Sequence, residues 1–139
     1  MKNLLFGGAA TSSMFADLLI LAARVTAGLS LALAHGLKKM PPSDQFVAGV
    51  EALGFPAPAA FAWMAGLAEL GGGFLLAVGF FTRPAAFFAG ITMFVASFMA
   101  HSSDPFQKQE LSLIYLAMFL IFVALGGGRF SIDRLFRKG

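Results

Sequence analysis

The chain has 139 residues, of which 58% are hydrophobic and only 12% are charged. A soluble domain is roughly 45–50% apolar and about 25% charged, so this composition predicts a membrane protein. The absence of cysteine excludes thiol–disulfide exchange, thiolate-ligated clusters and cysteine-attached haem as chemistry of this chain. The net charge of +3 does not indicate nucleic-acid binding, because the basic residues gather at helix ends rather than along a soluble face.

The apolar residues form long continuous runs, whereas the strands of an outer-membrane barrel alternate apolar and polar residues. This pattern predicts an all-α fold. A membrane span needs about 20 apolar residues, and four segments qualify, at approximately residues 15–35, 59–81, 84–100 and 111–126. We therefore expect one transmembrane domain over residues 1–139, built as a four-helix bundle with a basic tail at residues 127–139 that contacts membrane lipid.

The segment PPSDQFVAGVEALGFPAP separates the first two predicted spans. Ser43 is a residue type that caps helix N-termini, and the residues after it place apolar side chains on one helical face. We expect a short helix here that lies on the membrane surface.

Four spans place both termini on one side of the membrane, together with the turn that carries Arg83. The basic residues of this side are Lys2, Arg83, Arg129, Arg134, Arg137 and Lys138. The positive-inside rule assigns it to the cytoplasm. The N-terminal MKNLLFGGAATSS lacks an adequate apolar core, so we expect no cleaved signal peptide.

Two ionisable residues, Arg24 and Glu69, lie within the predicted spans. An ionisable side chain at that depth costs about 2.5–3.5 kcal/mol on insertion scales unless it has a partner. Counting about 1.5 Å per residue from the cytoplasmic ends puts both near mid-membrane, so we expect a buried Arg24–Glu69 pair. The neighbouring glycines would let another backbone approach the carboxylate closely.

Three roles for this pair stay open at this point. It can register the first helix against the second without adding stability. Glu69 and Arg24 can instead form a proton or quinol site, since carboxylates with perturbed pKa values gather at functional sites. They can also line a water-filled cavity.

His35, His101 and Glu110 lie where predicted helices end or begin near the outer interface. They can form a quinone-headgroup site at the membrane edge, or they can cap helix ends in a wet layer. Axial haem ligation or a metal site is a weaker alternative, because one histidine per helix lacks the tight spacing of known ligand sets.

The sequence resembles the DoxX family of small bacterial membrane proteins. The resemblance runs through ARVTAGLSLALAHGLKKM, AELGGGFLLAVGFFTRPAA, ELSLIYLA and GGGRFSID. The chain departs from the family pattern at Ser112, where a proline is typical, and at the closing Gly-Pro-Gly, which is Gly126-Gly127-Gly128. Recurrent family residues correspond to Arg24, His35, Lys38, Glu69, Thr82, Arg83, His101, Gly128, Arg129, Phe130, Ser131 and Asp133.

The resemblance implies a bacterial inner-membrane protein of redox pathways, because family members are named for quinol oxidase or thiosulfate:quinone oxidoreductase subunits. We expect a membrane subunit of a quinone-linked oxidoreductase that depends on a redox partner for its metal or flavin. The sequence does not decide whether this chain is itself an enzyme, or whether it forms a homo-oligomer. The alternative is a non-catalytic membrane scaffold, assembly factor or small-molecule carrier.

Overall fold

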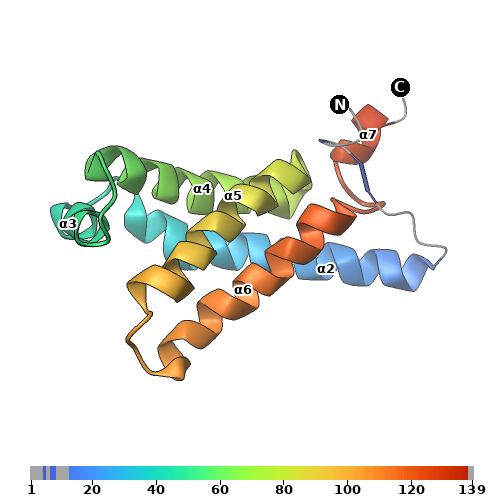
Figure 1. Cartoon of the computed structure of the whole chain (residues 1–139). Coiled ribbons are helices and arrows are strands. Elements are labelled where there is room, and N and C mark those ends of the chain that lie inside the picture. Colours follow the sequence, from blue (N-terminus) through green and yellow to red (C-terminus); the bar gives the residue numbers. More distant parts are fainter. Residues whose placement is uncertain (1–4, 6, 9–12, 138–139) are drawn as a thin grey trace.

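The structure, a computed structural model, describes residue 5, residues 7–8 and residues 13–137. Four helices in this part of the chain are long and apolar enough to cross a membrane: Met14–Lys39, Pro58–Val78, Thr82–Ala100 and Phe106–Leu125. No strand occurs among the described residues. The predicted all-α, four-helix membrane bundle is therefore confirmed (Figure 1).

The first and third spans each change helical type before they end. Helix α2 (Met14–Ser30) continues as a π-helical segment, η1 (Leu31–Gly36), and a 3-10 turn, η2 (Leu37–Lys39). The third span consists of α5 (Thr82–Val95) and a second π-helical segment, η3 (Ala96–Ala100). The second span is α4 (Pro58–Val78), the fourth is α6 (Phe106–Leu125), and the tail ends in a short helix, α7 (Asp133–Arg137).

The second span ends at Val78 instead of residue 81, and two other predicted boundaries differ by more. The first span passes the expected end at His35 and reaches Lys39, and the fourth begins at Phe106 instead of Leu111. Both differences add polar residues to a helix, because polar side chains can occupy the outer turns of a spanning helix as long as they reach the wet interface. Hydropathy alone marks the apolar part of each span and misses these turns.

The predicted short helix between the first two spans is present as α3 (Asp44–Ala52). The hydroxyl oxygen of Ser43 accepts a hydrogen bond from the backbone N–H of Phe46 at 3.2 Å, which satisfies one of the free donors at the helix start. Helix α3 lies at one end of the bundle, and α7 lies at the opposite end (Figure 1).

Helices α2 and α4 pack backbone to backbone through glycines. A Cβ atom added to Gly28 would lie 2.5 Å from the carbonyl oxygen of Gly73, and one added to Gly36 would lie 2.5 Å from the backbone nitrogen of Leu70. Real Cβ contacts are not this short, so only glycine permits the observed separation. These two contacts fix the register of α2 and η1 against α4.

The second close pairing in the bundle is that of α5 and α6, which run alongside each other (Figure 1). Their buried side chains include Met93, Tyr115, Phe119 and Phe122. The hydroxyl groups of Ser97 and Ser112 lie 2.6 Å apart in this buried layer. This hydrogen bond places Ser112, the residue that departs from the family pattern, inside the helix–helix contact.

The glycine packing gives a matched pair of substitutions on one helix. We expect Gly73→Ala to lower the free energy of unfolding by about 1–3 kcal/mol, because its Cβ would lie 2.7 Å from the Gly28 carbonyl oxygen. Gly71 has nothing within 4 Å of its Cβ position, so Gly71→Ala should be neutral or stabilising by about 0.5–1 kcal/mol. Titration with sodium dodecyl sulfate in mixed micelles measures both, and equal effects would contradict the packing argument.

Candidate functional site

Glu69 lies in the middle of α4 and is fully buried. Its Oε1 accepts a hydrogen bond from the Nζ of Lys39 at 2.5 Å, and the Lys39 side chain is 28% exposed while that of Glu69 is 1% exposed. The pair therefore joins a buried carboxylate to a cation that reaches the surface. A buried carboxylate without such a cation would be strongly unfavourable in a spanning helix.

The end of the first span brings Lys39 to this position. Gly36 packs against the backbone of Leu70, and Gly66 faces the Lys39 carbonyl oxygen and the Met40 side chain. The absence of side chains at these two glycines lets η2 lie directly against α4. Lys39 is thereby held beside the α4 turn that carries Glu69.

A cavity of about 260 Å³ lies over the ion pair. Its walls come from α3, α4, α5 and η3 and are almost entirely apolar. The Lys39 ammonium also lies 5.3 Å from the centre of the Phe46 ring, within the range of a cation–π interaction. The lining residues are Lys39, Phe46, Val50, Leu53, Phe55, Phe61, Met64, Ala65, Ala68, Glu69, Phe88, Ile91, Thr92, Val95, Ala96 and Ala100.

The second carboxylate oxygen of Glu69, Oε2, is buried, and no hydrogen-bond partner lies within reach of it among the described residues. Buried polar atoms in native proteins are nearly always hydrogen-bonded, so an unsatisfied one calls for an explanation. Because Glu69 lines the cavity, a ligand with a hydroxyl or amine group can supply the missing donor.

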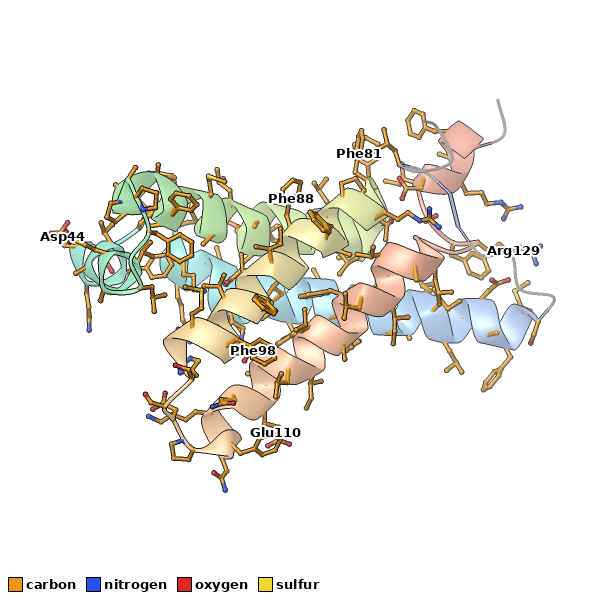
Figure 2. The ribbon with its side chains drawn as sticks, in the orientation of Figure 1. Asp44, Phe81, Phe88, Phe98, Glu110 and Arg129 are labelled. Atoms are coloured by element: carbon orange, nitrogen blue, oxygen red, sulfur yellow. The ribbon has the colours of Figure 1, made fainter. Side chains whose placement is uncertain are left out.

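The cavity opens toward the lipid. Its lining includes Met64, Phe88 and Ile91, which are 59%, 55% and 44% exposed, and Figure 2 shows Phe88 on the outer surface of α5. Since all three belong to spanning helices, the mouth of the cavity faces the hydrocarbon region of the membrane. A ligand dissolved in the bilayer can reach Glu69 without crossing water.

The predicted Arg24–Glu69 pair is wrong. Both residues are buried, but the guanidinium group of Arg24 binds backbone carbonyl groups. Its Nη1 donates to the carbonyl oxygens of Leu76 and Ala77, and its Nη2 donates to that of Phe130, all at 2.7 Å. Arg24 thus joins the last turn of α4 to the C-terminal tail.

The error lies in the assumed register of the two helices. The prediction assumed that the start of α2 and the end of α4 lie at the same depth in the membrane. In the structure, the first turns of α2 project beyond the α4–α5 turn (Figure 1). Gly28 consequently faces Gly73 and Ala77. Arg24, one turn before Gly28, meets the end of α4 and not its middle.

The tail is held by a second set of bonds around Asp133, which is buried. Its carboxylate accepts hydrogen bonds from the backbone N–H groups of Phe81 at 2.7 Å and Thr82 at 2.9 Å, where α5 begins. The backbone N–H of Asp133 donates to the Gly79 carbonyl oxygen at 2.9 Å. These bonds close the tail over the α4–α5 turn.

The Arg24 bonds predict a specific defect. Arg24→Met removes the guanidinium donor from the Ala77 and Phe130 carbonyl groups and leaves the Leu76 carbonyl with only the Gly79 N–H at 3.0 Å, so we expect a loss of about 3–5 kcal/mol in the free energy of unfolding. The tail should also detach and be cleaved faster by trypsin after Arg129 and Arg134. Arg83→Gln is the control, because the Arg83 guanidinium donates at the surface to the Ala124 carbonyl oxygen and should cost about 1 kcal/mol. A tail that resists trypsin equally in Arg24→Met and the native protein would contradict this role.

The three residues of the expected outer cluster have different contacts in the structure. The His35 ring packs edge-on against Tyr115 of α6, with ring centres 5.9 Å apart. The His101 Nδ1 lies 2.8 Å from Asp104 Oδ2 in the α5–α6 loop. Glu110 is exposed on α6 (Figure 2), next to Gln109, whose side chain donates a hydrogen bond to the His101 carbonyl oxygen at 2.6 Å. Among the described residues, no group of three His, Cys, Asp or Glu side chains could hold a metal ion, and quinone binding by these three residues stays a prediction.

Asp104 gives the α5–α6 loop a pH dependence. Hydrogen bonds from His101 and then Lys108 hold the pKa of the Asp104 carboxyl below its ordinary value of 3.8. A lowered pKa means that its stabilising contribution is complete above about pH 4 and is lost as the pH falls through the folded-state pKa. We expect Asp104→Asn to lower the melting temperature at pH 7 but not at pH 2.5, whereas a deficit that persists at pH 2.5 would contradict a charge-based role.

Sequence reasoning identified Glu69 but missed its partner Lys39 and the apolar cavity above them. Lys39 follows Lys38 at the end of the first span, and hydropathy gives no reason to choose between the two lysines. The useful signal was the pair of glycines, Gly36 and Gly66, that permits close backbone approach at this level. Such glycines indicate a contact only once the register of the helices is known.

The four spanning helices define a multi-pass membrane protein. The chain belongs to the DoxX family, whose sequence profile matches residues 19–102, more than half of its length. The match includes Arg24, Lys39 and Glu69. The similarities in ELSLIYLA and in the closing GGGRFSID lie beyond the matched residues and stay predictions.

One relative is a protein of Haemophilus influenzae described only as uncharacterized. It is 38% identical to this chain over 82 residues, an alignment that covers 54% of this chain and 61% of the relative. This chain thus spans less than two thirds of the relative's length. No solved structure matches the chain.

Proposed function

We propose that this DoxX-family protein is a membrane subunit of a quinone-linked oxidoreductase, and that the cavity above Glu69 and Lys39 binds the quinone headgroup. The observation that carries the proposal is the unsatisfied, buried Oε2 of Glu69 in a cavity that opens to lipid. The site therefore differs from the two that the sequence predicted, because Glu69 pairs with Lys39 instead of Arg24 and the residues that line the cavity do not include His35, His101 or Glu110.

The residues of the cavity fit a quinone in three respects. Lys39 Nζ can donate a hydrogen bond to a ring carbonyl oxygen, and Glu69 Oε2 can accept one from a ring hydroxyl. Aromatic side chains such as Phe46, Phe61 and Phe88 offer surfaces for a flat ring. A bound quinone would supply the two-electron, two-proton chemistry that no side chain of this chain can perform.

The chain's own contribution is to hold the ligand, exclude water and provide a place for a proton. Burial of Glu69 keeps bulk water from its carboxylate, and the Lys39 ammonium balances the negative charge when Glu69 is ionised. Lys39 is partly exposed, so this pair connects the cavity with the wet interface. In this proposal the electrons come from a redox partner subunit, because no side chain of this chain carries electrons by itself.

The alternative function is a carrier or scaffold without redox activity. The same cavity also supports this alternative, because an apolar cavity with one carboxylate and one lysine can bind many lipophilic molecules that carry a polar group. The two functions differ in the ligand that the cavity holds and in whether Glu69 affects electron flow.

Glu69→Gln tests the proposal, since the amide can still accept a hydrogen bond from Lys39 but cannot take up a proton. We expect loss of bound quinone in native mass spectrometry of protein extracted from its own membrane, and a fall in quinol-dependent electron transfer of about 100-fold or more. Glu51→Gln is the matched control, because Glu51 is exposed on α3 and should leave both properties unchanged.

Either of two results would reject the redox role. One is quinol-dependent electron transfer in Glu69→Gln at the native rate. The other is a bound molecule without redox chemistry that disappears in Glu69→Gln, which would support the carrier. Thermal melting of each variant must match the native protein for the comparison to concern function and not folding.

We also propose that the protein lies in the bacterial inner membrane with the α7 end in the cytoplasm. Arg83, Arg129 and Arg134 gather at this end, in keeping with the positive-inside rule. Because the chain contains no cysteine, single cysteines report orientation cleanly. A membrane-impermeant maleimide should label Ser103→Cys in intact spheroplasts and Leu135→Cys only after permeabilisation, and the reverse pattern would invert the orientation.

A further inference from the structure

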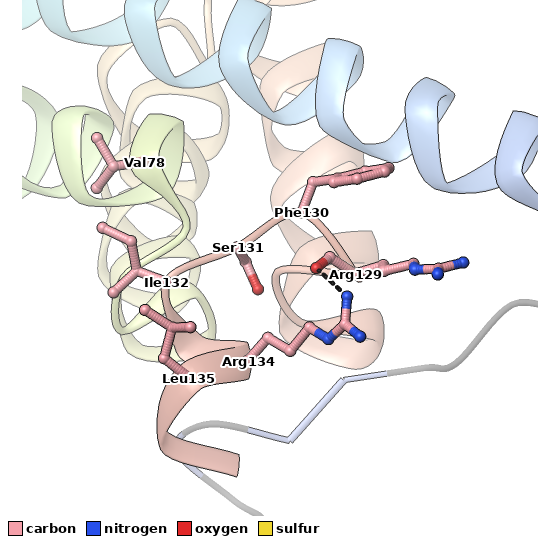
Figure 3. Close-up of a pocket in the computed structure, with 7 residues that line it drawn as sticks. All are labelled: Val78, Arg129, Phe130, Ser131, Ile132, Arg134 and Leu135. Atoms are coloured by element: carbon pink, nitrogen blue, oxygen red, sulfur yellow. Dashed lines mark hydrogen bonds between the residues drawn. The ribbon is translucent and has the colours of Figure 1, made fainter. Parts of the chain in front are cut away.

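The C-terminal tail forms a second pocket at the end of the bundle away from α3 and Glu69. It is an open pocket of about 500 Å³ that combines two arginines with apolar side chains (Figure 3). Its lining residues are Val78, Arg129, Phe130, Ser131, Ile132, Arg134 and Leu135. Neither the oxidoreductase proposal nor the family assignment gives this pocket a role.

The position of the pocket corresponds to a membrane surface. Val78, which lines it, is the last residue of α4, and α4 is a spanning helix. The apolar core of the membrane ends where the spanning helices end, so the pocket begins at the level of the lipid headgroups. Phe130, Ile132 and Leu135 are 38%, 39% and 73% exposed there, which is costly in water but not against the upper part of the acyl chains.

The charges facing the pocket favour an anion. Arg134 Nη1 donates to the Arg129 carbonyl oxygen at 3.3 Å, which holds the Arg134 side chain across the pocket (Figure 3). The Arg129 side chain is 48% exposed, and its Nη1 lies 3.9 Å from the carboxylate of Asp17. The pocket lining thus contains two arginines, one of which lies near the carboxylate of Asp17. Asp133 is buried and directs its carboxylate to the start of α5.

We propose that this pocket binds the headgroup of an anionic phospholipid of the surrounding leaflet. Arg129 and Arg134 bind the phosphate, for which guanidinium groups are suited because they donate two parallel hydrogen bonds. Val78, Ile132 and Leu135 contact the glycerol and upper acyl region. The apolar walls separate this ligand from free phosphate, which would gain nothing from them.

Lipid bound here would also cover the tail segment that Arg24 and Asp133 attach to the bundle. Phe130, whose carbonyl oxygen accepts from Arg24, and Arg129 are adjacent in the chain. A lipid that binds Arg129 therefore stabilises the same tail conformation from the membrane side, and its binding should protect the tail from proteolysis.

The test uses the full-length protein in nanodiscs that contain equal amounts of phosphatidylglycerol and phosphatidylcholine. Native mass spectrometry after release counts the lipids of each kind that remain bound. We expect the native protein to retain phosphatidylglycerol preferentially. In Arg129→Gln/Arg134→Gln, the ratio of bound phosphatidylglycerol to bound phosphatidylcholine should fall about fivefold for each arginine replaced. Lys38→Gln, which removes an exposed charge at the opposite end, should keep the native preference.

Three results would overturn the lipid site. They are equal retention of the two lipids by the native protein, an unchanged preference in the double variant, and displacement of the lipid by inorganic phosphate alone at millimolar concentration. If the double variant does not fold, the lipid preference of the native protein and that of Arg129→Lys/Arg134→Lys test the site. The lysines keep the charge but not the paired hydrogen bonds, so this variant should retain only part of the preference for phosphatidylglycerol. Glu69→Gln should bind phosphatidylglycerol normally, so this site and the quinone site are tested separately.

Discussion

The hydrogen bonds of Arg24 are the interaction on which the rest of the bundle depends. A helix leaves its last carbonyl groups without intrahelical donors, and those groups are costly to bury. One guanidinium group satisfies the carbonyls of Leu76 and Ala77 and also that of Phe130. The buried guanidinium group and the buried end of α4 therefore provide each other with hydrogen-bond partners. The tail is bound to the same guanidinium group.

This arrangement determines where the second buried charge can act. With Arg24 at the end of α4 and the glycines of α2 and α4 in contact, Glu69 lies about two helical turns from the carbonyl groups that Arg24 binds, beside the end of the first span. Lys39 supplies one hydrogen bond to it and leaves the other carboxylate oxygen free. Arg24 donates three hydrogen bonds to backbone carbonyl groups and holds the fold, whereas Glu69 keeps capacity for a ligand.

The two proposed ligands occupy opposite ends of the molecule and use different chemistry. The cavity above Glu69 is apolar, opens toward the hydrocarbon region and has its ion pair at one wall. The tail pocket is basic and opens where the spanning helices end. Each combines apolar walls with a few charged groups, which is the composition expected of a site for an amphipathic molecule. A membrane provides both quinones and anionic lipids without passage through water.

The sequence by itself determined the fold class, the four spans and the cap of α3. Each depends on residues close together in the chain: a span is a continuous apolar run, and Ser43 caps a donor three residues away. It also singled out Arg24 and Glu69, because charged residues inside apolar runs need an explanation. Only the tertiary structure decided their partners, since pairing depends on the offset between helices. The projecting start of α2 and the contacts at Gly28 and Gly36 set that offset. Because of it, Arg24 and Glu69 do not pair with each other and lie in two separate sites.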